Sequence, residues 1–161
     1  MSAAPVMACV ALGANLGDAA TTIRHALQKL ASLPDTQLVK ASSLYRSAPY
    51  EAQGPDFINA VALVRTQLSP LALLHALQAI ELRSGRERPY KNAPRTLDLD
   101  VIFYGDVTLD TPELTLPHPR WLERAFVLLP LAEVWPERVS EGLRDAVKDQ
   151  IIERLTTEDL P

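Results

Sequence analysis

The sequence predicts an α+β fold of the split βαβ, or ferredoxin-like, type. Two observations predict it: the segments follow the order strand, helix, strand, strand, helix, strand, and both helical segments carry one apolar face. In this arrangement a largely antiparallel sheet holds two helices on one face, and the C-terminal helices would cover the other face, which gives three layers. We therefore expect a single domain over residues 1–161.

The first half of the chain supplies one helix and three strands. Residues 6–12 form an apolar run that is typical of a buried strand, and Gly13 and Gly17 provide turn chemistry that ends it. Asp18 is a suitable N-cap for the following helix, which Pro34 ends. Two further strands are expected at 38–45 and 57–66.

The second half supplies a helix, a strand and a helical C-terminal region. Ser69 and Pro70 form the cap and first turn of a helix that ends at Gly85. The sequence TLDLDVIFYG predicts a strand with acids on one side and apolar residues on the other, namely Leu97, Leu99, Val101 and Phe103. Residues 124–134 predict short helical turns interrupted by Pro130, and residues 142–155 predict a last amphipathic helix.

The composition excludes several classes of protein. Apolar residues make up 47% and charged residues 22%, and the net charge of −4 argues against a protein that coats nucleic acid. No segment is long and apolar enough for a signal peptide or a transmembrane helix, so we expect no membrane partner. Cys9 is the only cysteine and lies in an apolar run, which indicates a core position and a reducing, cytoplasmic setting.

Asp98 and Asp100 are the candidate metal ligands. They stand two residues apart in the predicted strand, so they face the same side, with Cα atoms roughly 7 Å apart. Two metal ions in phosphoryl-transfer sites lie about 4 Å apart, and two such carboxylates can reach toward both. Magnesium suits them because it binds through one or two carboxylates together with water and substrate phosphates. For the tripeptide alone, a solvated strand face is the alternative.

A basic segment lies immediately before this strand. Five basic residues and one acid, Glu87, give it a local charge of +4, and the basic residues are Arg83, Arg86, Arg88, Lys91 and Arg95. Guanidinium groups can bind phosphate oxygens beside the metal ions, so the segment predicts a triphosphate site. Because the segment is polar, rich in helix-breaking residues and poor in apolar anchors, we also expect it to act as a lid that orders when ATP binds. A solvated charge run or a weak RNA-binding loop is the alternative.

Phe57 and Asn59 form a second candidate pair, because an aromatic ring and an amide two residues apart on a strand face the same way. The ring can stack on a flat heterocycle, and the amide can bond a pyrimidinone edge. Core packing is the alternative for Phe57. His118 lies between two prolines and could contact phosphate, and Glu81 could orient an arginine or form a surface salt bridge.

Five sequence blocks lie in order along residues 8–136: VALGANLGD, YRSAP, PDFINAV, KNAPRTLDLDVIFYG and LTLPHPRWLERAFVLLPLAEV. Together they resemble the 6-hydroxymethyl-7,8-dihydropterin pyrophosphokinase family of folate biosynthesis. The resemblance implies transfer of the β,γ-pyrophosphoryl group of ATP to the hydroxymethyl oxygen of the pterin, with AMP as the leaving group. It also implies two Mg²⁺ ions in the active site.

The resemblance further implies roles for individual residues. Asp98 and Asp100 would bind both magnesium ions, and Arg86 and Arg95 would join them in catalysis. The residues that contact or close over the triphosphate would be Arg86, Arg88, Arg95, His118 and Arg124. Gln78 and Glu81 would line the nucleotide side. The residues around the pterin would be Ser47, Pro49, Phe57, Asn59 and Phe126.

Some positions depart from the family pattern. Asn92 and Ala93 stand where many relatives have Trp-Gly, so lid closure must rely on Tyr90 or on arginines. Glu51 replaces a usual glycine, which predicts a different path for the pterin loop. Two other classes stay open: a nuclease or other Mg-dependent nucleotidyl or phosphoryl transferase, and a non-catalytic ferredoxin-like binding module. We expect a monomer whose partners are small molecules.

Overall fold

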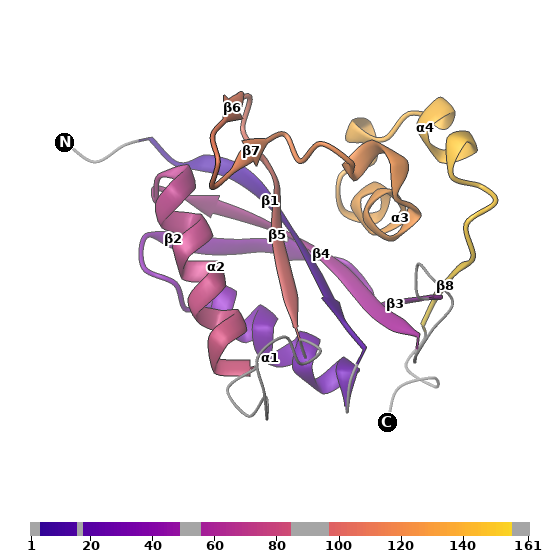
Figure 1. Cartoon of the computed structure of the whole chain (residues 1–161), viewed down its shortest axis with the longest axis horizontal. Helices are drawn as coiled ribbons and strands as arrows, with labels where there is room; N and C mark the ends of the chain where they lie inside the picture. The colour runs from indigo at the N-terminus through magenta and orange to yellow at the C-terminus, as the bar shows by residue number, and fades with distance from the viewer. Residues whose placement is uncertain (1–3, 16–17, 49–55, 85–96, 156–161) are drawn as a thin grey trace.

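An antiparallel sheet with helices on both faces organises the chain (Figure 1). The computed structural model describes residues 4–15, 18–48, 56–84 and 97–155. The strand order is β5, β1, β4, β3, β8, and β2 also pairs with β4; every pairing is antiparallel. The strands of this sheet are β1 (Val6–Ala14), β2 (Thr36–Ala41), β3 (Tyr45–Ser47), β4 (Phe57–Thr66), β5 (Asp98–Tyr104) and β8 (Ile152–Arg154).

The predicted split βαβ core is confirmed. Strands β1 and β4 lie next to each other in the sheet, with β5 on the outer side of β1. Strand β4 has the predicted bounds, whereas the predicted strand 38–45 is two strands, β2 and β3. The break falls at buried Ser42, whose hydroxyl accepts a hydrogen bond from the Val61 N–H at 2.9 Å. In a continuous strand pair a backbone carbonyl would accept this hydrogen bond, so the Ser42 side chain replaces one ladder bond.

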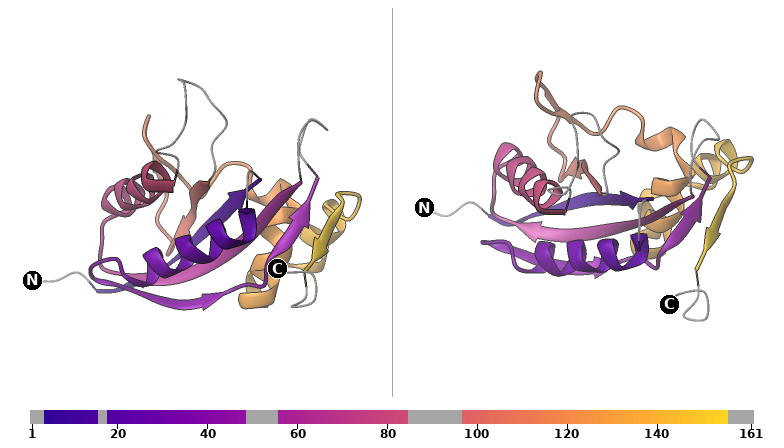
Figure 2. Two further views of the ribbon diagram at one scale, coloured as in Figure 1. Left: turned by 90° about the horizontal axis from the view of Figure 1, so that it is seen from below. Right: turned by 60° about the horizontal axis from the view of Figure 1, so that its bottom comes forward.

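Two helices cover one face of the sheet, α1 (Ala19–Ala31) and α2 (Pro70–Ser84) (Figure 2). Their predicted caps are confirmed: the Asp18 side chain accepts from the Thr21 N–H at 3.2 Å, and Ser69 Oγ accepts from the Ala72 N–H at 3.1 Å. The apolar faces of both helices pack into one core with β1, β4 and β5, through side chains such as those of Leu77.

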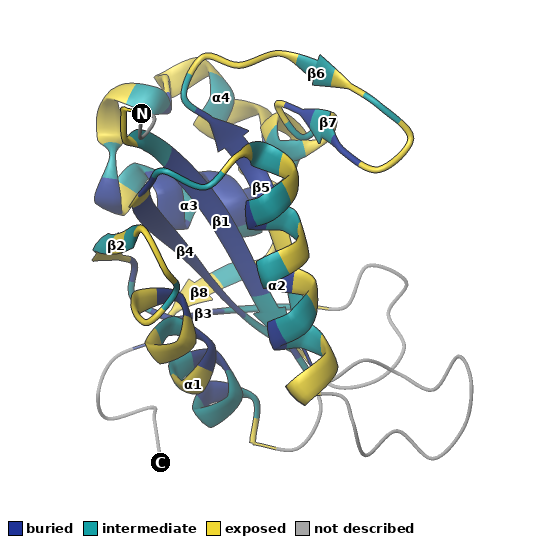
Figure 3. Ribbon diagram, turned by 90° about the vertical axis from the view of Figure 1, so that its left-hand side faces the viewer, coloured by how far each residue is buried: buried dark blue, intermediate teal, exposed yellow. Residues whose placement is uncertain are grey.

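Helix α3 (Ala125–Val134) covers the opposite face, so the predicted three-layer arrangement is confirmed. Figure 3 shows the buried strands β1, β4 and β5 between the two helical layers. The predicted interruption at Pro130 is wrong, since the helix continues through this buried residue. Proline removes only the N–H that would bond the Phe126 carbonyl, and the burial of neighbours such as Leu128 and Leu131 outweighs that loss.

The predicted alternation along β5 is correct only in its first half. Leu97, Leu99 and Val101 lie in the core under α1 and α2, but Phe103 lies in the core under α3. The pairing register shifts at this point, because Cys9 pairs with Phe103 while Val10 pairs with Val101. An extra residue in one strand reverses the side to which later residues point, so the expected position of Phe103 was wrong.

The predicted C-terminal helix 142–155 is also wrong. The chain forms a short helix, α4 (Glu141–Ala146), and then β8, which pairs with the edge of β3. Pairing supplies partners to the backbone groups of an otherwise free strand edge, which a longer helix could not do. The remaining elements are β6 (Leu109–Asp110), β7 (Thr115–Leu116) and the 3-10 helices η1 (Trp121–Glu123) and η2 (Pro136–Arg138). None of the helices in the described ranges is long and apolar enough to cross a membrane.

Candidate active site

Asp98 and Asp100 lie on the α3 side of strand β5. Asp100 pairs with Ala11 of β1, which belongs to the core under α3, whereas Leu99 belongs to the core under α1 and α2. Paired residues of an antiparallel ladder face the same side, so both carboxylates lie on the α3 face. The Asp98 residue is half-buried and Asp100 is exposed. This arrangement leaves both carboxylates on one face, with Asp100 open to solvent.

Gly13 lies between Asp98 and Asn59 in a row that crosses three strands. It pairs with Asp98 of β5 on one side and with Asn59 of β4 on the other. Adjacent strands lie about 4.8 Å apart, so the two functional residues stand about 10 Å apart with no side chain between them. The expectation that Gly13 forms a turn was therefore wrong. The glycine is a strand residue, and its missing side chain opens a gap.

The amide of Asn59 is held in a fixed orientation. Its residue is only 3% exposed, and its Nδ2 donates to Ser47 Oγ at 2.7 Å. Its Oδ1 faces the gap, because a Cβ added to Gly13 would lie 3.4 Å from this oxygen. Phe57 pairs with Ser47 at the end of β4, on the same side as Asn59. The amide oxygen, the hydroxyl and the ring thus belong to one surface next to the Gly13 gap.

His118 enters this region on the segment after β7. Its backbone N–H donates to the Ile102 carbonyl at 2.7 Å, and its Nδ1 accepts from the Arg120 N–H at 3.2 Å. The pKa of His118 is lowered, mainly because the ring is partly buried; Asp100 opposes this shift, and Arg124 and Arg120 add to it. A neutral ring with Nδ1 as acceptor carries its proton on Nε2, which is a hydrogen-bond donor.

Arg124 and Phe126 lie at the start of α3. The guanidinium of Arg124 stands over the Phe126 ring, with its carbon 5.4 Å from the ring centroid. Gln150 fixes this helix start, because its Oε1 accepts from the Ala125 N–H at 2.9 Å and its Nε2 donates to the Glu123 carbonyl at 2.7 Å. Sequence reasoning missed Gln150, since no local pattern shows that residue 150 returns to residues 123–125.

Glu133 was also missed, and it joins α3 to β3. The Oε1 atom of Glu133 accepts hydrogen bonds from the Ser43 N–H at 3.0 Å and from the Tyr45 hydroxyl at 2.8 Å. Burial, and to a smaller extent the hydrogen bond and the charge of Glu133, raise the pKa of Tyr45 to about 12. Because β3 carries Ser47 and α3 carries Phe126, Glu133 fixes two walls of the region relative to each other.

The remaining predicted residues divide into two groups. Gln78 is exposed on α2, and Glu81 of the same helix accepts a hydrogen bond from the Leu99 N–H at 2.8 Å. The other predicted site residues, Pro49, Arg86, Arg88 and Arg95, lie outside the described residues. The departures from the family pattern at positions 51, 92 and 93 also lie outside them. Of the arginines in the basic segment that Glu81 was expected to orient, only Arg83 lies within the described residues, in the last turn of α2.

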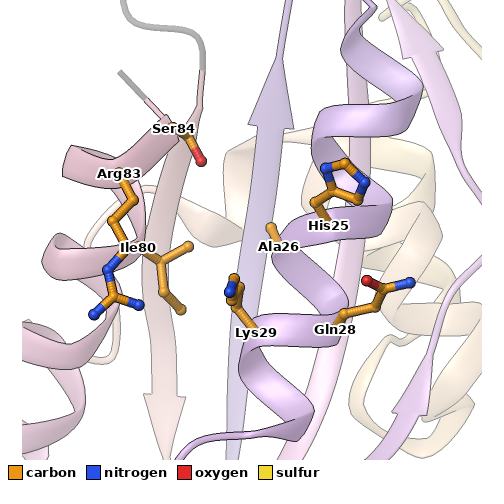
Figure 4. A pocket seen from close by; sticks show the side chains of 7 residues that line it. All are labelled: His25, Ala26, Gln28, Lys29, Ile80, Arg83 and Ser84. Carbon is orange, nitrogen blue, oxygen red and sulfur yellow. The ribbon is translucent and has the colours of Figure 1, made fainter. Parts of the chain in front are cut away.

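A pocket of about 420 Å³ lies elsewhere, between α1 and α2 (Figure 4). Ala26 and Ile80 form apolar parts of its wall, and the basic side chains around it are those of His25, Lys29 and Arg83. Lys29 and Arg83 occupy the last turns of their helices, where cations complement the helix dipole. This pocket lies in the helical layer on the face of the sheet opposite to α3, so it is separate from Asp98, Asp100 and Asn59.

Comparisons with known proteins decide the family. The family model described as 7,8-dihydro-6-hydroxymethylpterin-pyrophosphokinase matches residues 9–136. The 2-amino-4-hydroxy-6-hydroxymethyldihydropteridine pyrophosphokinase of Pseudomonas aeruginosa is 49% identical over 135 residues, which cover 83% of this chain and 83% of that protein. The chain belongs to this family. The protein of the same name from Synechocystis sp. is 46% identical over 132 residues, covering 82% of this chain and 68% of that protein.

Membership in the family makes this chain an ATP-dependent pyrophosphokinase of folate biosynthesis, and it does not favour a nuclease or a binding module. A solved structure, described as HPPK-DHPS in complex with substrates, matches with a TM-score of 0.69 at 15% identity. The match covers 91% of this chain and 43% of that chain, so this chain spans less than half the length of that protein. This likeness confirms the ferredoxin-like fold.

Proposed function

We propose that the α3 face of the sheet transfers the β,γ-pyrophosphoryl group of ATP to the hydroxymethyl oxygen of 6-hydroxymethyl-7,8-dihydropterin. The observation that carries the proposal is the row of Asp98, Gly13 and Asn59 across three neighbouring strands. The row offers a metal ligand at one end, a heterocycle-binding amide at the other, and no side chain between them. A hydroxymethyl group could therefore extend from the amide end toward the carboxylate end.

The pterin is assigned to the Asn59 end of the row. Asn59 Oδ1 would accept from the pyrimidinone edge of the ring, and the hydrogen bond to Ser47 holds the amide in that orientation. Phe57 of β4 and Phe126 of α3 would stack on the two sides of the ring. The Arg124 guanidinium over Phe126 would fix the second aromatic side chain before the substrate enters. Pro49 would complete the pocket.

Two Mg²⁺ ions are assigned to Asp98 and Asp100. The donor set suits this metal, because two carboxylates leave coordination positions for water and phosphate oxygens. Within the described residues no group of three or more His, Cys, Asp or Glu side chains is arranged to enclose a metal, which fits an open site that the substrate completes. When bound, the ions would neutralise the triphosphate and make its β-phosphorus easier to attack.

The chain's own residues would position the triphosphate. His118 would donate from Nε2 to a phosphate oxygen, and Arg124 would place its charge at the same end. Arg86, Arg88 and Arg95 would close over the triphosphate, and Gln78 of α2 would line the nucleotide side. Attack by the pterin oxygen on the β-phosphorus breaks its bond to the oxygen that bridges the α- and β-phosphorus atoms, and that oxygen leaves on AMP.

The product of turnover tests the reaction. The purified protein is incubated with ATP, MgCl₂ and the reduced hydroxymethylpterin, and nucleotides and pterins are separated by chromatography. We expect AMP and the pterin diphosphate in equal amounts. ADP with a pterin monophosphate, or AMP that forms equally well without the pterin, would show a different reaction.

A matched pair of variants tests the metal assignment. Asp98→Asn should lower turnover by about two to four orders of magnitude, because a site that loses a metal ligand loses several kcal/mol of transition-state stabilisation. Binding of the pterin, measured by calorimetry, should stay close to wild type. The control Asp106→Asn changes an exposed carboxylate just after β5 and should keep full turnover. Full turnover by Asp98→Asn would remove the basis of the metal assignment.

We also propose that residues 1–161 form one domain that acts as a cytoplasmic monomer. The described residues support this with two cores that lie on the two faces of one sheet. Their exposed large apolar side chains are spread over α2, η1 and two loops, namely Leu71, Leu82, Val107, Leu122 and Ile151. Sedimentation equilibrium should give a mass of 17.7 kDa, and a mass of twice that value would contradict the monomer.

A further inference from the structure

Glu81 connects helix α2 to the strand that carries both aspartates. Its Oε2 accepts a hydrogen bond from the Leu99 N–H at 2.8 Å. Leu99 stands between Asp98 and Asp100, so this carboxylate holds the peptide that joins the first aspartate to the next residue. A side chain on a helix therefore acts on the backbone between two assigned metal ligands.

The position of β5 in the sheet explains why such a contact matters. Strand β5 lies at one end of the strand order and has β1 as its neighbour. In an antiparallel pair, alternate backbone N–H groups point away from the partner, and at a sheet edge they need another acceptor. Glu81 supplies that acceptor for Leu99, whose side chain is 4% exposed and packs in the same core as Leu77 and Ile80.

We propose that Glu81 is a positioning residue that fixes the backbone of β5 and thereby sets the spacing of the two aspartate carboxylates. The proposal rests on the proposed function, which assigns the magnesium ions to those carboxylates. It differs from the nucleotide contact that the family resemblance implies, because the partner is the protein backbone. The proposed role also differs from that of a third metal ligand, since within the described residues no three His, Cys, Asp or Glu side chains lie where they could bind one metal ion.

The proposal separates two substitutions that a ligand role would not separate. Glu81→Gln keeps an amide oxygen that can accept from the Leu99 N–H, whereas Glu81→Ala removes the acceptor. His75→Ala is the control on the same helix, because His75 is exposed and its Nε2 lies 3.3 Å from the carboxylate of the exposed Glu113. Thermal unfolding of each variant establishes that it is folded before the other measurements are made.

The first readout needs neither metal nor substrate. Amide hydrogen exchange at Leu99 is measured by NMR in the ligand-free protein. Glu81→Ala should speed exchange at this amide by about ten- to a hundredfold, because its partly buried hydrogen bond loses the acceptor, while Glu81→Gln and His75→Ala should stay within about threefold of wild type. Unchanged exchange in Glu81→Ala would overturn the proposal.

The second readout is the Mg²⁺ concentration that gives half-maximal turnover at saturating ATP and pterin. Glu81→Ala should raise it about tenfold or more and leave the KM for the pterin unchanged, and Glu81→Gln should stay near wild type. Equal losses in both variants would assign Glu81 to a charged contact with metal or nucleotide instead. An unchanged Mg²⁺ requirement with faster Leu99 exchange would reduce Glu81 to a purely structural role. If the wild-type protein forms no AMP, the proposed function fails, and the exchange result stands apart from it.

Discussion

Gly13→Ala is expected to weaken binding of the pterin without weakening the fold. The added Cβ would lie 3.4 Å from Asn59 Oδ1, which is ordinary van der Waals contact. Gly13 lies within β1, and among the described glycines only Gly105 has a positive φ, at 52°. Alanine is favoured over glycine in a strand by about 0.5–1 kcal/mol, so the variant should be at least as stable as wild type.

The cost should appear only when the gap is filled by a substrate. A methyl group inserted where the substrate packs costs about 1–3 kcal/mol, which corresponds to about 5- to 150-fold weaker binding of the pterin. Titration calorimetry with the pterin, and the KM for the pterin in the AMP assay, measure this loss. The KM for ATP should change little, because the nucleotide is assigned to the Asp98 side of the row.

Gly142→Ala is the matched control. Gly142 lies in the short helix α4, and a Cβ added there would lie 3.8 Å from Oγ of the N-cap Ser140, which is also ordinary van der Waals contact. It makes the same chemical change at a position that the proposal does not use. The reasoning is refuted if Gly13→Ala binds the pterin as tightly as Gly142→Ala does. A large fall in the melting temperature of Gly13→Ala would instead show that the glycine is required for the fold.

Three further predictions follow from buried groups. Tyr45→Phe should lower the free energy of unfolding by about 1.5–3 kcal/mol at pH 7, because a hydrogen bond to the charged Glu133 is lost. The folded-state pKa of Tyr45 is raised from 10.0 to about 12, so this stabilisation is complete below pH 10 and is lost as the pH rises through about 12. Urea unfolding of wild type and Tyr45→Phe should therefore show a smaller difference in unfolding free energy at pH 11.5 than at pH 7. Cys9 is fully buried and its thiol pKa is strongly raised by burial, so a thiol reagent should label the native protein at pH 8 far more slowly than the urea-unfolded protein, and equal rates would contradict the packing. Leu128→Ala should cost about 2–5 kcal/mol of unfolding free energy, since this side chain is 0% exposed between α3 and the sheet; a loss under 1 kcal/mol would contradict its place in that core.

The features that the sequence predicted correctly depend on short-range rules. The caps at Asp18 and Ser69 are local hydrogen bonds, and strand β4 is rich in apolar and β-branched residues. The common face of Asp98 and Asp100 follows from the two-residue period of a strand, which holds because the register shift in β5 comes after both residues.

The features that it missed depend on contacts between distant segments. The break at Ser42 requires Val61, the clamp at Glu133 requires Ser43 and Tyr45, and the helix start at Ala125 requires Gln150. Each pair is separated by many residues, so neither partner carries a local signal. The C-terminal strand β8 is a similar case, because its amphipathic sequence also suits a helix and only the free edge of β3 selects the extended form.

The candidate site joins both kinds of information. Strand periodicity places Asp98 with Asp100, and Phe57 with Asn59, but it cannot say how far apart the two pairs lie. That distance is set by β1, which inserts between β4 and β5 and brings Gly13 to the same level as Asp98 and Asn59. A glycine that looks like a turn residue along the chain becomes, across the sheet, the position that separates the two binding chemistries while leaving space for substrates to meet. For this reason a side chain at Gly13 should affect substrate binding more than folding.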